Sequence, residues 1–98
     1  MNKKYSLNRL DGIQARREQY EFFEQVGDQE LCEKAKAEFI RGTARQILEL
    51  KKSDIVNKEE IIVKLRKEAL VHLNICLFGR HLSLRTRVGL ITRLLSTF

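Results

Sequence analysis

The sequence predicts an all-α fold: a small bundle of three long helices plus a shorter, basic amphipathic C-terminal helix. The 98 residues contain no proline and only five glycines, so the residues that usually form the turns of multistranded sheets are scarce. Apolar residues recur at steps of three and four along most of the chain, which is the spacing of one helix face. A composition of 43% hydrophobic and 33% charged residues suits amphipathic helices, and the length predicts a single helical domain over residues 1–98.

The first helix is predicted over residues 11–26, after an irregular lead-in over residues 1–10. Gly27 follows directly and is well suited to end a helix, because glycine readily adopts the left-handed conformation found there. The apolar residues of this segment fall on or near one face: Ile13, Tyr20, Phe23 and Val26.

The second helix has the most regular pattern in the chain. Asp28 is expected to cap its first turn through the side-chain carboxylate, and the helix should reach Lys51 or Lys52. Two adjacent apolar rows make a stripe wide enough to contact two neighbouring helices. The first row holds Leu31, Ala35, Phe39, Thr43, Ile47 and Leu50, and the second holds Cys32, Ile40, Ala44 and Leu48.

The third helix is predicted from Asn57 to about Phe78. Asn57 and Glu60 have the spacing of a capping box, with asparagine in place of the usual serine or threonine. The second half, residues 69–78, is apolar nearly all round and is expected to be the most buried segment of the fold. The breaks between helices are short, so consecutive helices should be antiparallel neighbours.

The last segment, residues 79–98, is predicted as a semi-independent helix, with Gly79 ending the preceding helix and Ser83 as the N-cap. Gly89 lowers its intrinsic stability, so it is expected to need a surface on which to fold. The apolar pattern of this last helix suits packing on the third helix and insertion into a membrane interface equally well. The apolar stripe consists of Leu84, Val88, Ile91, Leu95 and Phe98.

The net charge of +6 lies entirely in the second half of the chain. Residues 1–50 hold nine basic and nine acidic residues, whereas residues 51–98 hold ten and four, with no acidic residue after Glu68. A basic half indicates an anionic neighbour. The start of the chain lacks the apolar stretch of a secretory signal and no apolar run is long enough to span a bilayer, so we expect a cytoplasmic protein, peripheral at most to the membrane. The candidate residues for an anionic surface are Arg80, Arg85, Arg87, Arg93, Lys64 and Lys67.

The sequence contains few groups suited to catalysis. His72 and Cys76 stand four residues apart, with Cys32 as the one obvious third metal ligand, but a partly buried histidine and reduced, buried thiols explain them better. Ser83 is better explained as a cap than as a nucleophile, and no glycine-rich turn follows a strand. We therefore expect no catalytic, cofactor or metal site and no enzyme activity from this chain alone.

Three stretches give a resemblance to a known family: "YSLNRLDGIQARREQYEFFEQVGDQEL", "EEIIVKLRKEAL" and "HLSLRTRVGLITRLLS". Together they resemble the C-terminal helical region of bacterial family 2 glycosyltransferases, the enzymes of capsule and exopolysaccharide assembly. The resemblance covers nearly the whole chain, and the nucleotide-sugar domain of that family is absent from it. It implies a non-catalytic accessory tail that packs on a glycosyltransferase catalytic domain and associates with the cytoplasmic membrane surface.

Two alternative functions stay open at this point. A small basic helical protein that binds nucleic acid is one, although the basic residues are not interleaved with aromatic residues and no recognition helix stands out. A structural helical homodimer is the other, because exposed stripes on short bundles are often completed by a second copy.

Overall fold

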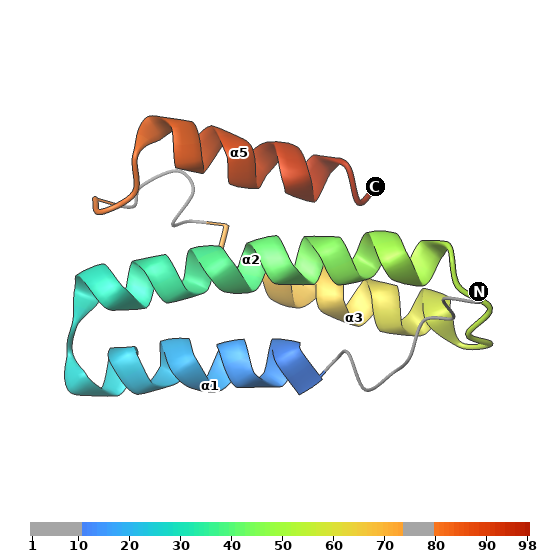
Figure 1. Cartoon of the computed structure of the whole chain (residues 1–98), viewed down its shortest axis with the longest axis horizontal. Helices are drawn as coiled ribbons and strands as arrows, with labels where there is room; N and C mark the ends of the chain where they lie inside the picture. Colours follow the sequence, from blue (N-terminus) through green and yellow to red (C-terminus); the bar gives the residue numbers. More distant parts are fainter. Residues whose placement is uncertain (1–10, 74–79) are drawn as a thin grey trace, which may run out of the picture.

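The computed structural model describes residues 11–73 and 80–98, and these form four helices without any strand. In chain order they are α1 (Asp11–Val26), α2 (Gln29–Lys51), α3 (Lys58–Val71) and α5 (Leu84–Leu95) (Figure 1). The all-α prediction is confirmed. The lead-in predicted over residues 1–10 lies outside the described residues.

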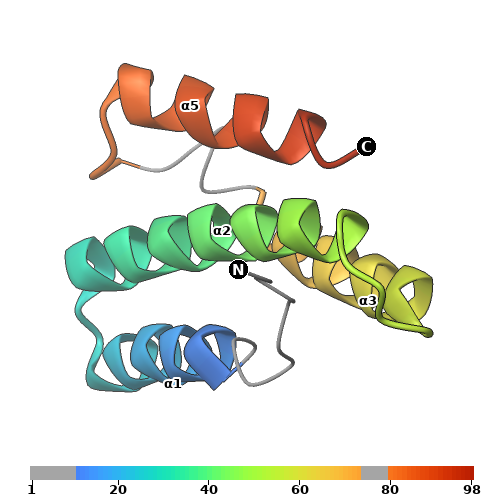
Figure 2. The same ribbon diagram turned by 45° about the vertical axis from the view of Figure 1, so that its right-hand side comes forward.

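Helix α2 is the central element of the bundle. Figures 1 and 2 show α1 on one side of α2, α5 on the opposite side, and α3 alongside. The substantial helix contacts all involve α2, which packs against α1, α3 and α5. Helices α1 and α3 run antiparallel to α2, whereas α5 runs parallel to it. The apolar stripe of α2, which was expected to contact two neighbouring helices, therefore contacts three.

Three of the predicted helix ends are confirmed. Gly27 ends α1 with a φ of 78°, in the left-handed region that favours glycine. The Asp28 carboxylate accepts a hydrogen bond from the Leu31 amide at 3.0 Å and so caps α2. The Ser83 hydroxyl accepts one from the Thr86 amide at 3.2 Å and caps α5.

Two predictions for the third helix are wrong. Asn57 occupies the N-cap position, but its side chain makes no capping hydrogen bond, so the predicted capping box does not form. The helix ends at Val71, with His72 as its C-cap, and not near Phe78. In the described part of the segment that was expected to be the most buried, residues 69–78, Ala69 is fully buried but Leu70 and Val71 are 38% and 72% exposed. Residues 74–79, including Cys76 and the predicted terminator Gly79, lie outside the described residues.

The core consists of two clusters that meet on α2. The first joins α1, α2 and α3 and holds Ile13, Tyr20, Ala35, Phe39, Ile47, Leu50, Ile62 and Leu65. The second joins α2, α3 and α5 and holds Ala37, Ile40, Ala69, Leu82, Leu90 and Leu94. Because both clusters draw on α2, that helix supplies the largest fully buried side chains, Phe39, Ile40 and Ile47 among them.

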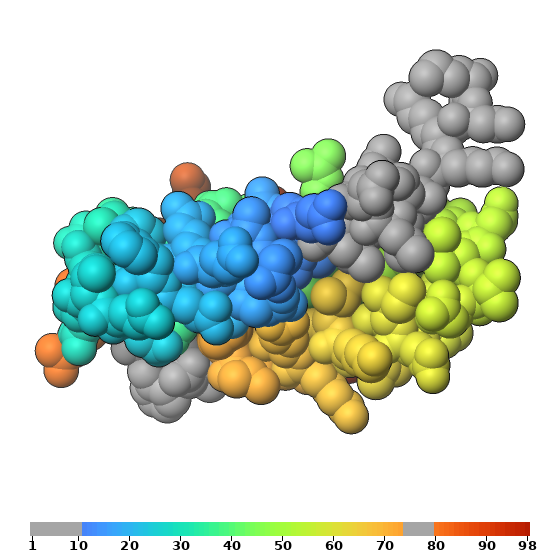
Figure 3. All heavy atoms as spheres, turned by 90° about the horizontal axis from the view of Figure 1, so that it is seen from below, coloured from blue at the N-terminus to red at the C-terminus, as the bar shows by residue number. Residues whose placement is uncertain are grey.

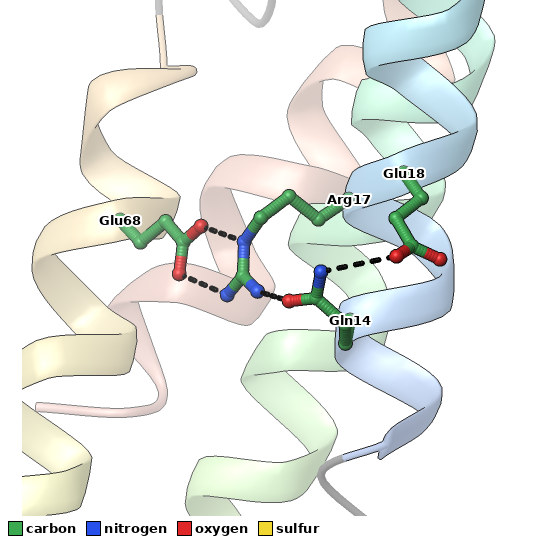
Figure 4. A network of polar contacts seen from close by, with 4 residues as sticks. All are labelled: Gln14, Arg17, Glu18 and Glu68. Carbon is green, nitrogen blue, oxygen red and sulfur yellow. Dashed lines mark hydrogen bonds and ion pairs between the residues drawn. The ribbon is translucent and has the colours of Figure 1, made fainter.

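An ion pair links α1 to α3 across the first cluster (Figure 4). The Arg17 guanidinium donates to both carboxylate oxygens of Glu68, with Nη2 at 2.6 Å from Oε1, and Gln14 accepts a further hydrogen bond from it. Both charged side chains are largely buried, with exposed fractions of 26% and 30%. The pair raises the pKa of Arg17, mainly through the hydrogen bonds to Glu68. It therefore fixes α1 against α3 by a two-pronged contact with defined geometry.

Candidate functional site

Helix α5 buries a different face from the apolar stripe read in the sequence. Leu90, Leu94 and Thr97 are at most 2% exposed, and the two leucines belong to the second core cluster. Ile91 is the one member of the predicted stripe that is half-buried. The other four members form an exposed line that we call the α5 ridge: Leu84 (70% exposed), Val88 (53%), Leu95 (66%) and Phe98 (67%).

The α5 ridge and the buried face are distinct sides of one helix. Successive helical residues are about 100° apart, which places the line through Leu90 and Leu94 roughly 120° from the ridge. Helix α5 therefore has enough apolar residues for two contacts, and the bundle uses only one of them. Three large apolar side chains exposed on one short helix, with Phe98 just beyond its end, are more than isolated surface residues and indicate an interaction surface.

The three arginines of α5 occupy different positions around the helix relative to the ridge. Arg85 is exposed on one flank, and Arg87 is half-buried on the other flank. Arg93 is exposed and lies roughly opposite the ridge. No acidic residue occurs in α5, so the whole helix is basic.

The remaining three predicted surface residues are not gathered at this ridge. Arg80 is exposed in the segment before α5 and lines a hollow at the junction of α1 and α2. Lys64 and Lys67 are exposed on α3. Arg66 is the basic residue of α3 that turns toward α5, and Lys64 lies roughly opposite it around the helix.

Arg66 is not among the residues predicted for an anionic surface, but the structure places it beside the last turn of the chain. Its guanidinium lies 4.4 Å from the centre of the Phe98 ring and donates a hydrogen bond to the Thr97 carbonyl. The Lys51 ammonium donates to the Phe98 carbonyl at 3.5 Å. These contacts fix the last turn after α5 to α2 and α3. No local pattern could have revealed them, because Arg66 and Thr97 are 31 residues apart in sequence.

The hollow of about 620 Å³ near the turn from α1 to α2 contains charged groups that are already paired. Glu24 and Lys36 form an ion pair at 3.3 Å, and the Glu33 carboxylate accepts from the His81 amide at 3.1 Å. Cys32 also lines this hollow, and burial raises the pKa of its thiol. A thiol with a raised pKa is a poor nucleophile, so the hollow does not supply a reactive cysteine.

His72 packs among aromatic rings. Its ring centre lies 4.7 Å from that of Tyr20 and 5.6 Å from that of Phe39, both in edge-to-face geometry. Burial lowers the pKa of His72, and the nearby Lys36 ammonium lowers it further. Among residues 11–73 and 80–98 no group of three His, Cys, Asp or Glu side chains is close enough to hold a metal ion. The predicted partner Cys76 lies outside the described residues.

Comparison of the chain with models of protein families, with curated proteins and with solved structures found no match. Within the described residues, no helix combines the length and apolar character needed to cross a bilayer. Within residues 11–73 and 80–98, the α5 ridge with exposed Arg85 beside it is an apolar and basic surface open to solvent.

Proposed function

We propose that this chain is a non-catalytic helical module that binds an anionic membrane surface through the α5 ridge. The observation that carries the proposal is that Leu84, Val88 and Leu95 stay more than half exposed although α5 is packed on the bundle. An amphipathic helix of this kind lies in the plane of the interface, with its apolar residues among the acyl chains and its cations near the headgroups.

The apolar contribution to binding is moderate. Transfer of each ridge side chain from water to the bilayer interior stabilises the bound state by about 1 to 2 kcal/mol, given that half to two thirds of each is exposed. Loss of translational and rotational freedom opposes much of this gain. Insertion of the ridge alone should therefore give weak and reversible attachment, which requires a second contribution to become stable.

The arginines supply that second contribution. Each basic residue near an anionic lipid surface stabilises binding by about 1 kcal/mol. Arg85 is exposed beside the ridge, and its long apolar stem allows the guanidinium group to reach headgroups while the ridge is inserted. The absence of acidic residues from α5 means that no carboxylate opposes this attraction within the helix.

The resemblance to glycosyltransferase tails gives this attachment a role. In that setting the module seats a catalytic domain at the cytoplasmic face of the membrane, where lipid-linked acceptors are found. The chemistry belongs to the catalytic domain, so the chain alone is expected to turn over no nucleotide-sugar. Sugar transfer or hydrolysis by the purified chain would contradict this part of the proposal.

The ridge is tested by co-sedimentation of the chain with phosphatidylcholine vesicles that contain increasing fractions of phosphatidylglycerol. Binding is expected to rise with the anionic fraction, and Val88→Asp should abolish it. Val63→Asp on α3 is the matched control, because Val63 is similarly exposed at 45% but lies on another helix. Equal binding of the Val88 variant and the unsubstituted chain would overturn the proposal.

The charge contribution has its own matched pair of variants. Arg85→Gln should lower the partition onto anionic vesicles by about fivefold, the equivalent of about 1 kcal/mol. Lys64→Gln changes the net charge equally but alters α3, and should have a smaller effect. An equal loss in both variants would show that overall charge, and not the position of α5, directs binding.

A further inference from the structure

The outer face of α1 complements α5 in charge. We define the α1 outer face by its exposed residues Glu18, Glu21, Phe22 and Val26. Phe22 and Val26 are one turn apart and are 58% and 59% exposed, so this helix also presents apolar surface to solvent. Figure 3 views the molecule from the side of α1 and shows this helix across a large part of the surface.

The basic residues of α1 are turned away from this face. Arg17 is held by Glu68 of α3. Arg16 lies against α2, where a Cβ atom on Gly42 would come within 2.5 Å of its Nη1 atom. The carboxylates of Glu18 and Glu21 are therefore the exposed charges beside Phe22, and the α1 outer face combines apolar with acidic character.

We propose that the α5 ridge of one molecule packs on the α1 outer face of a second copy. Leu84, Val88 and Leu95 of the ridge, with half-buried Ile91 between them, follow the four-and-three spacing of a coiled-coil seam along α5, and Phe98 lies just beyond its end. The exposed cation that flanks this seam is Arg85. Pairing of two α5 helices would bring the Arg85 side chains of the two copies together, whereas pairing with α1 brings Arg85 to Glu18 and Glu21.

The position of the two faces makes this contact intermolecular. Helices α1 and α5 lie on opposite sides of α2, so they cannot meet within one molecule (Figures 1 and 2). Each copy offers one α5 ridge and one α1 outer face, and the contact joins different surfaces of the two copies. A contact of this type extends head to tail into short chains unless its geometry closes a ring.

The contact is expected to be weak. Helix α5 is about 18 Å long and α1 about 24 Å, so one helix pair buries less surface than a typical stable protein interface. Association should therefore appear only at high protein concentration and should decrease as salt screens the arginine and glutamate charges. This self-association goes beyond the membrane proposal. It does not depend on that proposal, because the association is measured without lipid.

The test uses two half-blocked variants in sedimentation velocity experiments without lipid. Glu18→Arg with Glu21→Arg blocks the α1 outer face, and Arg85→Glu with Val88→Asp blocks the α5 ridge. The unsubstituted chain should show a mass that rises with concentration beyond the dimer, and each variant alone should stay monomeric. An equimolar mixture of the two variants should form a one-to-one dimer and nothing larger, because each partner retains one intact face.

Two results would overturn the inference: an unsubstituted chain that stays monomeric at every concentration, or an α1-blocked variant that associates as strongly as the unsubstituted chain. The second result would indicate pairing of two α5 helices. Glu59→Arg with Glu60→Arg is the control for net charge, since these exposed glutamates lie in the first turn of α3 and should leave association unchanged. Vesicle binding by the α1-blocked variant reports on the membrane proposal separately, because its α5 ridge is intact.

Discussion

Leu94 and Leu95 provide a direct test of which face of α5 belongs to the core. The two leucines are adjacent in the same helix, so replacement of either by alanine changes helix propensity equally. Leu94 is 2% exposed and packs in the second core cluster, whereas Leu95 is 66% exposed on the α5 ridge. The structure therefore predicts opposite outcomes for two chemically identical substitutions.

The magnitudes follow from burial. Leu94→Ala removes a buried side chain and leaves a cavity beside Ile40 and Leu90, which typically costs about 3 kcal/mol or more of unfolding free energy. Leu95→Ala removes a side chain that is mostly in water and should change the free energy by less than about 0.5 kcal/mol. For a domain of this size the first change lowers the melting temperature by about 10 to 25 °C.

Urea unfolding followed by circular dichroism at the helix band measures both variants. The midpoint should fall strongly for Leu94→Ala and stay nearly constant for Leu95→Ala, with unchanged slopes that confirm a common unfolding transition. The reverse order would refute the assignment, because it would mean that the stripe containing Leu95 is the packed one. The α5 ridge, and both proposals built on it, would then be lost.

Three further substitutions test other features of the bundle. Glu68→Gln removes the charge that Arg17 binds and should lower the free energy of unfolding by about 1 to 2 kcal/mol. Urea titrations at two ionic strengths should show a smaller loss in high salt, because salt screens the ion pair. Gly89→Ala should raise it by up to about 1 kcal/mol, since nothing lies within 4 Å of the added Cβ and alanine favours helix; a loss would mean that this position is crowded. The lowered pKa of His72 means that the unfolded chain binds the proton more readily, so stability falls as the pH drops below about 6.5, and His72→Phe should remove this part of the decline.

The helix starts and ends that were predicted correctly depend on local chemistry. Asp28 and Ser83 bond to amides three residues away, and Gly27 ends α1 through its own backbone conformation. Such signals are complete within a few residues of sequence, so they can be read without knowledge of the fold. The regular stripe of α2 was also predicted well, because a central helix buries its apolar residues whichever neighbours it has. Leu31 and Leu48 are the members that remain over a third exposed.

The buried face of α5 could not be predicted because the helix carries two apolar lines. Leu90 and Leu94 are as apolar as the ridge residues, and only the position of α2 and α3 determines which line is covered. The end of α3 at Val71 has a similar cause, because an apolar run permits a helix but does not require one. Whether the basic residues of α3 share a surface with α5 likewise depends on tertiary structure, which places Arg66 beside Phe98 and leaves Lys64 and Lys67 exposed elsewhere on α3.

The parallel course of α5 along α2 has a consequence for the order of folding. Helices α1 and α3 reach α2 through short connections, whereas the residues that flank α5, Phe98 and His81, meet residues of α2 that lie 47 and 48 positions away in sequence, Lys51 and Glu33. Closure of so long a loop loses more chain entropy than closure of either hairpin, so the three-helix unit should assemble first and α5 dock last. The same hierarchy makes α5 the first helix to detach under stress, and its amide hydrogens should exchange with solvent before those of α2.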